Sequence, residues 1–214
     1  MQILIIRHGE SEADILHVHE GRADYGLTAR GHAQARALAN RLLGEYKIDK
    51  IYTSSLKRAR QTASYLAAGA GVIAALEDDL MEFNNGQLAG LAQSTADETY
   101  PEEKGLPAHQ GAYKQESRLE FRFRAERMLS RILSENGEND VVAVVTHGGM
   151  INQLYQAYLA MPVNGGAAFP TGDTGLHRWV IKNSARYVAM SNDTSHLAQL
   201  DENAENAYPA CVGI

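Results

Sequence analysis

The fold is decided by the stretch QILIIRHG, residues Gln2–Gly9. Its first part, Ile3–Ile6, is a short apolar run rich in β-branched residues, which predicts a central strand buried on both faces. The run stops abruptly at Arg7 and His8. Because open α/β sheets bind ligands just beyond the carboxyl ends of their parallel strands, we expect Arg7 and His8 to lie at the active edge of the sheet.

A second apolar run ends in a similar way. Residues 140–146 (DVVAVVT) are apolar on both faces, which predicts another central strand, and His147 follows them directly. If the two strands are parallel neighbours, His8 and His147 face each other at the same edge. A helix then begins at Gly148 and Gly149, whose backbone N–H groups are open to an anion. The two strands therefore predict an anion-binding site.

Strands and helices alternate along the remaining chain. The predicted helices cover about 28–46, 55–68, 117–134 and 148–161, and the predicted strands about 49–54, 72–76, 176–181 and 187–191. Thr28 is the expected N-cap of the first helix, and Gly69 and Gly71 are expected to end the second. This alternation predicts an α/β fold, a three-layer α/β/α sandwich with a mainly parallel central sheet.

We expect one domain over residues 1–200, because 214 residues with 44% hydrophobic content can build one substantial core. Residues 12–26 lack a clean period and are expected to form a loop. Residues 83–116 carry glycines and prolines in a weak pattern that is too long for an ordinary connection, so we expect a lid-like insertion with some helix. Residues 201–214 are polar and are expected to form a loosely held tail.

The composition limits the partners of the protein. A formal net charge of -6 argues against nucleic acid or an anionic membrane, because both require a basic face. No run is long enough to span a membrane, and the N-terminal apolar run is too short for a secretion signal. A single cysteine, Cys211, suits a cytoplasmic protein, and the sequence is compatible with a homodimer. His17 and His19 could pair on a metal, but histidines in a polar loop are more often solvated, so we expect no metal site.

A third segment brings a cation to the same edge. The predicted strand 49–54 passes into a helix that carries Arg58 in its first turn. A basic residue there opposes the helix dipole, so its presence suggests that a bound anion compensates it. Arg7 adds a planar fork of donors that matches phosphate geometry. Together with His8 and His147, these arginines favour phosphate as the anion.

Seven short segments of the chain form a pattern. They are RHGES at 7–11, LT with a glycine and QA at 27–35, SSLKRARQTA at 54–63, Glu82 followed by Gly86 and Gly90, Glu116-Ser117 with Arg124, VTHGG at 145–149 and NDTSHL at 192–197. Each motif alone is a weak signal, whereas all of them in this order and spacing are specific. In this arrangement the chain resembles the histidine phosphatase superfamily, which has the phosphoglycerate mutase-like fold.

The resemblance implies a role for each matched residue at the sheet edge. His8 would be the nucleophile that becomes a phosphohistidine, because a neutral imidazole is competent near pH 7. Arg7, Arg58, His147 and Gly148 would hold the phosphoryl oxygens, with His147 also part of the catalytic set. Phosphoryl transfer depends on positioning and on cations against these oxygens, so no metal and no cofactor are implied.

The resemblance also assigns an acid. An alkoxide leaving group needs a proton, so a carboxylic acid must stand opposite the nucleophile. Glu82 matches the family's acid, which would protonate the leaving group and then activate water. The nearby Glu77, Asp78 and Asp79 are its rivals, although such acids usually form a solvated edge.

One position departs from the family's pattern. The family usually has asparagine seven residues after the signature arginine, where it donates to the phosphate, and this chain has Asp14. A carboxylate cannot donate, and it repels phosphate unless it is protonated or paired. We hypothesise that Arg22 is its partner, and we do not count Asp14 among the phosphate-binding residues.

Three functions are compatible with this site, and we favour metal-independent hydrolysis of a small phosphorylated metabolite through phosphohistidine. The second is a phosphoglycerate mutase. Mutases of the family carry a Trp-Asn pair and a basic Tyr-Gly-Gly segment where this chain has Ala13-Asp14 and Phe83–Gly86. The third is a protein-phosphohistidine phosphatase or a module that binds phosphorylated ligands without catalysis. A binding module needs no nucleophile, so the retained histidines, arginines and acid weigh against it.

Overall fold

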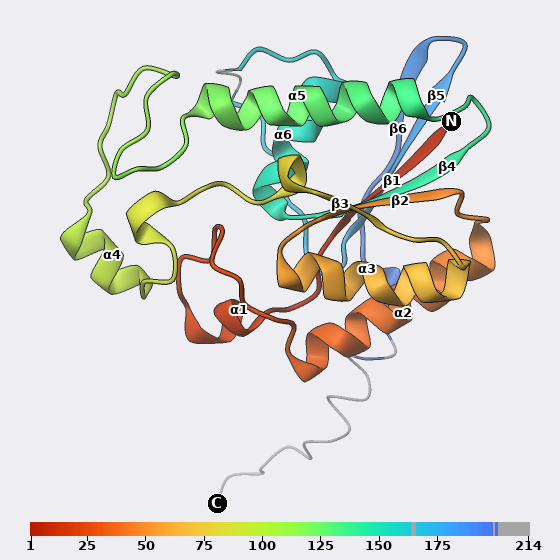
Figure 1. The fold of residues 1–214 in the computed structure, drawn as a ribbon, viewed down its shortest axis with the longest axis horizontal. Coiled ribbons are helices and arrows are strands. Elements are labelled where there is room, and N and C mark those ends of the chain that lie inside the picture. Colours follow the sequence, from red (N-terminus) through yellow and green to blue (C-terminus); the bar gives the residue numbers. More distant parts are fainter. Residues whose placement is uncertain (164–165, 199, 201–214) are drawn as a thin grey trace, which may run out of the picture.

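The computed structural model describes residues 1–163, 166–198 and 200. Within this part of the chain, six strands form one sheet in the order β3-β2-β4-β1-β5-β6 (Figure 1). The strands are β1 (Gln2–Arg7), β2 (Lys50–Ser54), β3 (Ala75–Glu77), β4 (Val141–Thr146), β5 (Leu176–Lys182) and β6 (Ala185–Asp193). The first four are parallel, whereas β5 and β6 form an antiparallel hairpin and β5 is antiparallel to β1. The mainly parallel sheet is therefore confirmed.

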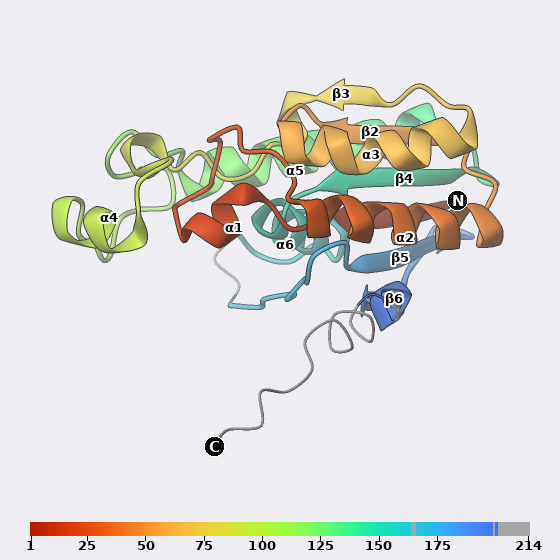
Figure 2. The same ribbon diagram turned by 90° about the horizontal axis from the view of Figure 1, so that it is seen from below.

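Helices cover both faces of the sheet (Figures 1 and 2). One face carries α2 (Ala29–Glu45) and α3 (Lys57–Ala70), and the other carries α5 (Arg118–Glu135) and α6 (Gly148–Tyr158). Side chains of β1 alternate between two cores: Ile3 and Ile5 pack in the α5 and α6 layer, and Leu4 and Ile6 pack in the α2 and α3 layer. Burying each of these side chains contributes about 1.5–3 kcal/mol. The three-layer sandwich is confirmed.

The strand register places the ends of β1 and β4 side by side. Arg7 lies opposite Thr146, so His8 and His147 follow their strands at the same level. The His8 amide N–H donates to Thr146 O at 2.9 Å and extends the ladder by one residue. Figure 2 shows α1 (Glu12–Leu16) and α4 (Gln93–Thr99) beyond this carboxyl edge of the sheet.

Two N-caps explain how the segment after β1 folds. Thr28 caps α2 as predicted, because its hydroxyl accepts from Gly31 N at 3.0 Å. The loop expected over 12–26 is wrong at its start, where α1 forms. Ser11 and Asp14 make a reciprocal capping box there, which satisfies N–H groups of a helix only five residues long.

The end of α3 differs from the prediction. Gly71 ends the helix with φ +68°, as expected, but Gly69 lies inside it. A Cβ at Gly69 would lie 2.2 Å from Leu43 Cδ1, so the glycine permits close packing of α3 on α2. The following strand starts later than residue 72, because Val72 N still donates to Ala67 O at the helix end.

Residues 83–116 contain the 3₁₀ helix η2 (Gly86–Leu88) and α4, which agrees with the expectation of some helix. An isolated antiparallel bridge joins Val18 to Ala92 and so ties this segment to the chain that follows α1. Two further 3₁₀ helices are η1 (Asp78–Leu80) and η3 (Ser195–Leu197). No helix in the described part of the chain is long and apolar enough to cross a membrane. The polar tail predicted at 201–214 lies outside the described residues.

Candidate active site

The predicted site residues come together beyond the ends of β1 and β4. The rings of His8 and His147 have centroids 5.1 Å apart, as their parallel strands predicted. Arg58 reaches the pair from α3, with its Nε 3.2 Å from His8 Nε2. His8, Arg58 and His147 are between 0% and 2% exposed. Two imidazoles and a guanidinium therefore share one buried position at the sheet edge.

The contacts of His8 define its protonation state. Its Nδ1 is 2.8 Å from Gly9 O, and because a carbonyl can only accept, the proton must lie on Nδ1. Nε2 accepts from Arg58 Nε. Burial lowers the pKa of His8 well below its ordinary value, and Arg58 and then Arg7 lower it further. The imidazole is therefore neutral, with its lone pair on Nε2 and facing the cations.

His147 has one ring nitrogen bonded and one without a partner. Its Nε2 is 2.8 Å from Ser54 Oγ at the end of β2. Its Nδ1 is buried and has no hydrogen-bond partner among the described residues. Burial lowers the pKa of His147 well below its ordinary value, with Arg58 as the next contribution. A buried polar atom without a partner is rare in proteins, and it is expected where a ligand binds.

Arg58 is fixed by the loop between α1 and α2. One terminal nitrogen donates to Gly21 O at 2.8 Å, and the other donates to Ala23 O at 3.0 Å. Gly21 has φ +46°, a conformation that favours glycine. Burial lowers the pKa of Arg58, but a guanidinium stays charged near pH 7. The two carbonyls leave Nε aimed at His8.

Arg7 is held by the turn that precedes β5. Its Nη1 donates to Thr171 O at 2.8 Å, and its Nη2 lies 3.4 Å from Asp173 Oδ1. The same turn is attached to β1, because Thr174 N donates to His8 O at 3.1 Å. These contacts fix the guanidinium of Arg7 next to His8.

Glu82 lies at the N-terminus of α6. Its Oε2 accepts from Gly149 N at 2.8 Å, and its Oε1 accepts from Phe83 N at 2.7 Å. The expectation that Gly148 and Gly149 both leave open N–H groups is therefore wrong for Gly149. A carboxylate within the chain satisfies one of the unpaired amides of a helix N-terminus and complements its dipole.

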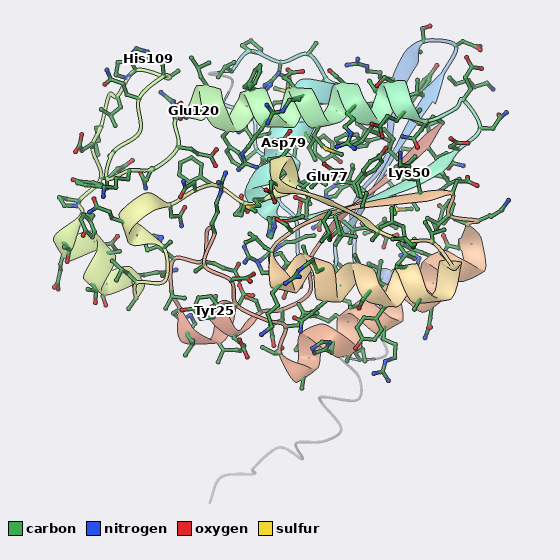
Figure 3. All side chains as sticks on the ribbon, in the orientation of Figure 1. Tyr25, Lys50, Glu77, Asp79, His109 and Glu120 are labelled. Atoms are coloured by element: carbon green, nitrogen blue, oxygen red, sulfur yellow. The ribbon has the colours of Figure 1, made fainter. Side chains whose placement is uncertain are left out.

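The three rivals of Glu82 point elsewhere. Asp79 pairs with Arg127, Glu77 Oε2 accepts from Arg131 at 2.6 Å, and Asp78 Oδ1 accepts from Ser55 at 2.6 Å. Figure 3 shows Glu77 and Asp79 beside α5, which carries Arg127 and Arg131. Among these four acids, the described contacts bring only Glu82 to the edge where His147 begins α6.

Arg124 positions the acid-bearing segment, and sequence reasoning gave it no role. Its guanidinium donates to Asp79 O at 2.9 Å, to Met81 O, and to Glu82 O at 2.8 Å. Glu116 binds the same guanidinium through both oxygens, at 2.7 and 3.0 Å. The available signal was its place in the motif of Glu116-Ser117 with Arg124, on the predicted helix 117–134.

Asp14 has a different partner from the one hypothesised. Its Oδ2 accepts from the amide and the hydroxyl of Ser11, both at 2.8 Å, and its Oδ1 lies 3.8 Å from Arg7 Nη2. Arg22 instead lies 3.7 Å from Glu116. The hypothesised pair of Arg22 with Asp14 is therefore wrong, because the capping box holds Asp14 on α1.

Sequence reasoning also missed Glu20. Its Oε2 lies 3.1 Å from Arg58 Nε and 3.8 Å from His8 Nε2. Burial raises the pKa of Glu20 above its ordinary value. No period or motif marked this residue, which lies in the loop between α1 and α2.

No cluster of three or more His, Cys, Asp or Glu in the described residues could hold a metal ion, His17 and His19 included.

A family model of the histidine phosphatase superfamily, branch 1, matches residues 3–194. The chain belongs to this superfamily. Phosphoglycerate mutase-like protein 4 of Arabidopsis thaliana is 34% identical to this histidine phosphatase over 170 residues, 72% of this chain and 70% of that protein. Phosphoserine phosphatase 1 of Hydrogenobacter thermophilus is 27% identical over 214 residues, 97% of this chain and 99% of that protein.

Solved structures show the same relationship. The mycobacterial glucosyl-3-phosphoglycerate phosphatase in complex with VO3 matches this histidine phosphatase with a TM-score of 0.76 and 25% identity, over 89% of this chain and 98% of that one. The resemblance noted in the sequence is confirmed. Membership of the superfamily and phosphatase relatives make the protein a phosphohydrolase.

Proposed function

We propose that this histidine phosphatase hydrolyses phosphomonoesters of small metabolites through a phosphohistidine at His8, without a metal ion. The observation that carries the proposal is the fixed tautomer of His8. Gly9 O holds the proton on Nδ1, so the Nε2 lone pair faces Arg58 and can attack phosphorus. Arg7, Arg58 and His147 then face the negative phosphoryl oxygens.

In the first step, the Nε2 lone pair of His8 forms a bond to phosphorus and the ester P–O bond breaks. The electrons of that bond go to the leaving oxygen, which takes a proton from the Glu82 carboxylic acid and departs as an alcohol. Glu82 is positioned for this by Gly149 N and by Arg124, which holds its backbone carbonyl.

In the second step, water attacks the phosphohistidine. The Glu82 carboxylate takes one proton from the water as its oxygen bonds to phosphorus, and the N–P bond breaks. The electrons of that bond return to His8 Nε2, and inorganic phosphate leaves. His8 and Glu82 are then in their starting states, so no further reactant is needed.

We propose that the leaving group of the substrate lies in a cavity of about 350 Å³ that Phe83, the residue after Glu82, helps to line. The other lining residues lie between 102 and 118. The lining is partly apolar and carries both signs of charge, including Glu102, Lys104 and Arg118. This cavity belongs to residues 83–116, the insertion expected from the sequence, and it suits a small polar alcohol better than an apolar one.

The first test is hydrolysis of p-nitrophenyl phosphate in the presence of EDTA. We expect turnover that EDTA does not reduce, because the site relies on arginines rather than a metal. Activity should persist well below about pH 6.5, the ordinary pKa of histidine. The reason is that the depressed pKa of His8 keeps the nucleophile neutral there. No turnover between about pH 4 and 9 would contradict the proposal.

Substrate choice is tested with a panel of phosphometabolites. Phosphoserine and glucosyl-3-phosphoglycerate are included because relatives are named for them. Phosphate release is measured for each, together with conversion of 3-phosphoglycerate to 2-phosphoglycerate. We expect phosphate release from at least one metabolite, whereas efficient isomerisation of 3-phosphoglycerate would replace the phosphatase by a mutase.

Gly149→Ala should lower kcat for an alkyl phosphate such as phosphoserine about tenfold or more, because its Cβ would lie 2.4 Å from Glu82 Oε1 and displace the acid. Alanine is the better helix former, so loss of folding is not the expected cause. Gly44→Ala in α2 is the control, since nothing lies within 4 Å of its Cβ. Steady-state kinetics of both variants provide the measurement, and an unchanged kcat in Gly149→Ala would contradict the placement of the acid.

The cellular compartment and the oligomeric state of the enzyme are also proposals. One cysteine in 214 residues suits a reducing compartment such as the cytoplasm. A homodimer stays a prediction, which light scattering on the purified protein would test.

A further inference from the structure

Glu20 is an acidic residue within the phosphoryl site that the mechanism above does not use. Its side chain is 17% exposed. The backbone holds it on both sides: His19 N donates to Leu91 O at 2.8 Å, and Ala23 N donates to Glu20 O at 2.8 Å. Backbone hydrogen bonds on both sides of Glu20 therefore fix the position of its carboxylate within the loop.

The position of this carboxylate overlaps that of the phosphoryl group. Its Oε2 lies 3.1 Å from Arg58 Nε and 3.8 Å from His8 Nε2. Reacting atoms in a near-attack complex are about 3–3.5 Å apart, so phosphorus must approach His8 Nε2 that closely. The phosphoryl oxygens then need the same contact with Arg58 that Glu20 makes. One oxygen of Glu20 stands where a phosphoryl oxygen has to stand.

Charge makes the overlap more severe. Asp14 and Asp173 already face Arg7, at 3.8 and 3.4 Å. With Glu20 ionised as well, three carboxylates surround the two arginines. A phosphate dianion that enters this cradle meets a like charge at the position it must occupy, in a buried site where charge repulsion is weakly screened.

We propose that Glu20 is a specificity-determining residue of the phosphoryl site, which admits a phosphorylated substrate only when Glu20 is protonated. The ionised carboxylate pairs with Arg58 and excludes the phosphoryl group. The protonated acid carries no charge, and its O–H donates to a phosphoryl oxygen as an amide would. This inference rests on the proposed phosphatase function, and it predicts that substrate binding weakens as the pH rises.

The groups that face Glu20 fix the direction of this pH dependence. They are Arg58 from α3, Arg7 and the neutral His8 from the end of β1, and Ser11 and Asp14 at α1. Burial raises the pKa of Glu20, and Asp14 raises it further, whereas Arg58, Ser11 and Arg7 oppose the rise. The binding-competent, protonated form is present below this raised pKa and is lost as the pH rises through it.

The test compares wild type with Glu20→Gln, which is neutral at every pH and has the same shape. The measurement is KM for p-nitrophenyl phosphate and Ki for inorganic phosphate from about pH 4 to 9. We expect the variant to show KM and Ki about tenfold lower than wild type at the alkaline end and equal values at the acidic end. The substrate's own ionisation affects both proteins equally. The ratio of the wild-type KM to the variant KM at each pH therefore reports only the effect of Glu20.

Glu98→Gln is the matched control, because it removes one negative charge from the exposed face of α4. The ratio of the wild-type KM to the Glu98→Gln KM should stay near one at every pH. An effect equal to that of Glu20→Gln would overturn the proposal. A flat ratio, or weaker phosphate binding in Glu20→Gln, would also overturn it. Arg58 keeps its bonds to Gly21 and Ala23 in the variant, so the fold should survive, and thermal unfolding checks this. Should Glu20→Gln unfold, Glu20→Ser takes its place.

Failure of the proposed function gives a different result. If wild type hydrolyses no phosphomonoester, the phosphatase proposal fails, but calorimetry with inorganic phosphate still compares the two proteins. Tighter phosphate binding by Glu20→Gln at alkaline pH supports the role of Glu20 without any turnover. Equal binding at all pH values contradicts it.

Discussion

Replacing His8 with alanine should reduce turnover of p-nitrophenyl phosphate by more than about 10⁴-fold. We do not expect His147 to take its place, because its ring centroid lies 5.1 Å from that of His8 and its Nε2 is engaged with Ser54 Oγ. Without a covalent intermediate, the remaining cations can still bind phosphate. The variant should therefore lose kcat while it keeps affinity for inorganic phosphate within about tenfold.

The control for this variant removes a histidine outside the site. His32→Ala on α2 loses one hydrogen bond with Tyr65, 3.0 Å long, and should retain turnover. Near-ultraviolet circular dichroism of both variants checks that the fold is intact.

Rapid quenching of wild type should also show a phosphoryl adduct that is stable in alkali and lost in acid, as expected for phosphohistidine. His8→Ala should lack this adduct. Residual turnover close to wild type would mean that another group is the nucleophile.

The residues at strand ends were predictable from the sequence because their placement needs only topology. His8 and His147 follow two uniformly apolar runs, and such runs are central strands whose carboxyl ends share one edge. Arg58 follows a third strand in the same way. The parallel register of β1 and β4 then brings the two rings together without any further information.

The contacts that join distant loops were not predictable in this way. Glu20 reaches Arg58 across 38 positions of sequence, and Glu82 reaches Gly149 across 67. Such pairs depend on the path of loops that carry no hydrophobic period, so nothing local specifies them. The short helix α1 was missed for a related reason: five residues are too few for an apolar stripe, although the Ser11 and Asp14 spacing of its capping box was visible.

Replacing Glu82 with glutamine should produce a defect that depends on the leaving group. For an alkyl phosphate such as phosphoserine, kcat/KM is expected to fall about 10²–10⁴-fold, because its alkoxide cannot leave without a proton. For p-nitrophenyl phosphate the fall should be less than about tenfold, since nitrophenolate is stable unprotonated. The comparison uses kcat/KM because this parameter covers only the steps up to departure of the leaving group.

The difference between the two substrates distinguishes loss of the proton donor from a disturbance of the active-site geometry. Glu82 accepts from two backbone amides, and an amide side chain can satisfy only one of them, so Glu82→Gln also disturbs the start of α6. Such a disturbance would slow both substrates alike, whereas loss of the acid slows only the poor leaving group. Glu82→Ala has no donor either and should show the same difference. Glu77→Gln loses only its bond to Arg131 at 2.6 Å and should show none. Equal losses for both substrates in both Glu82 variants would mean that the proton comes from another group, and Glu20, 3.8 Å from His8 Nε2, would be the next candidate.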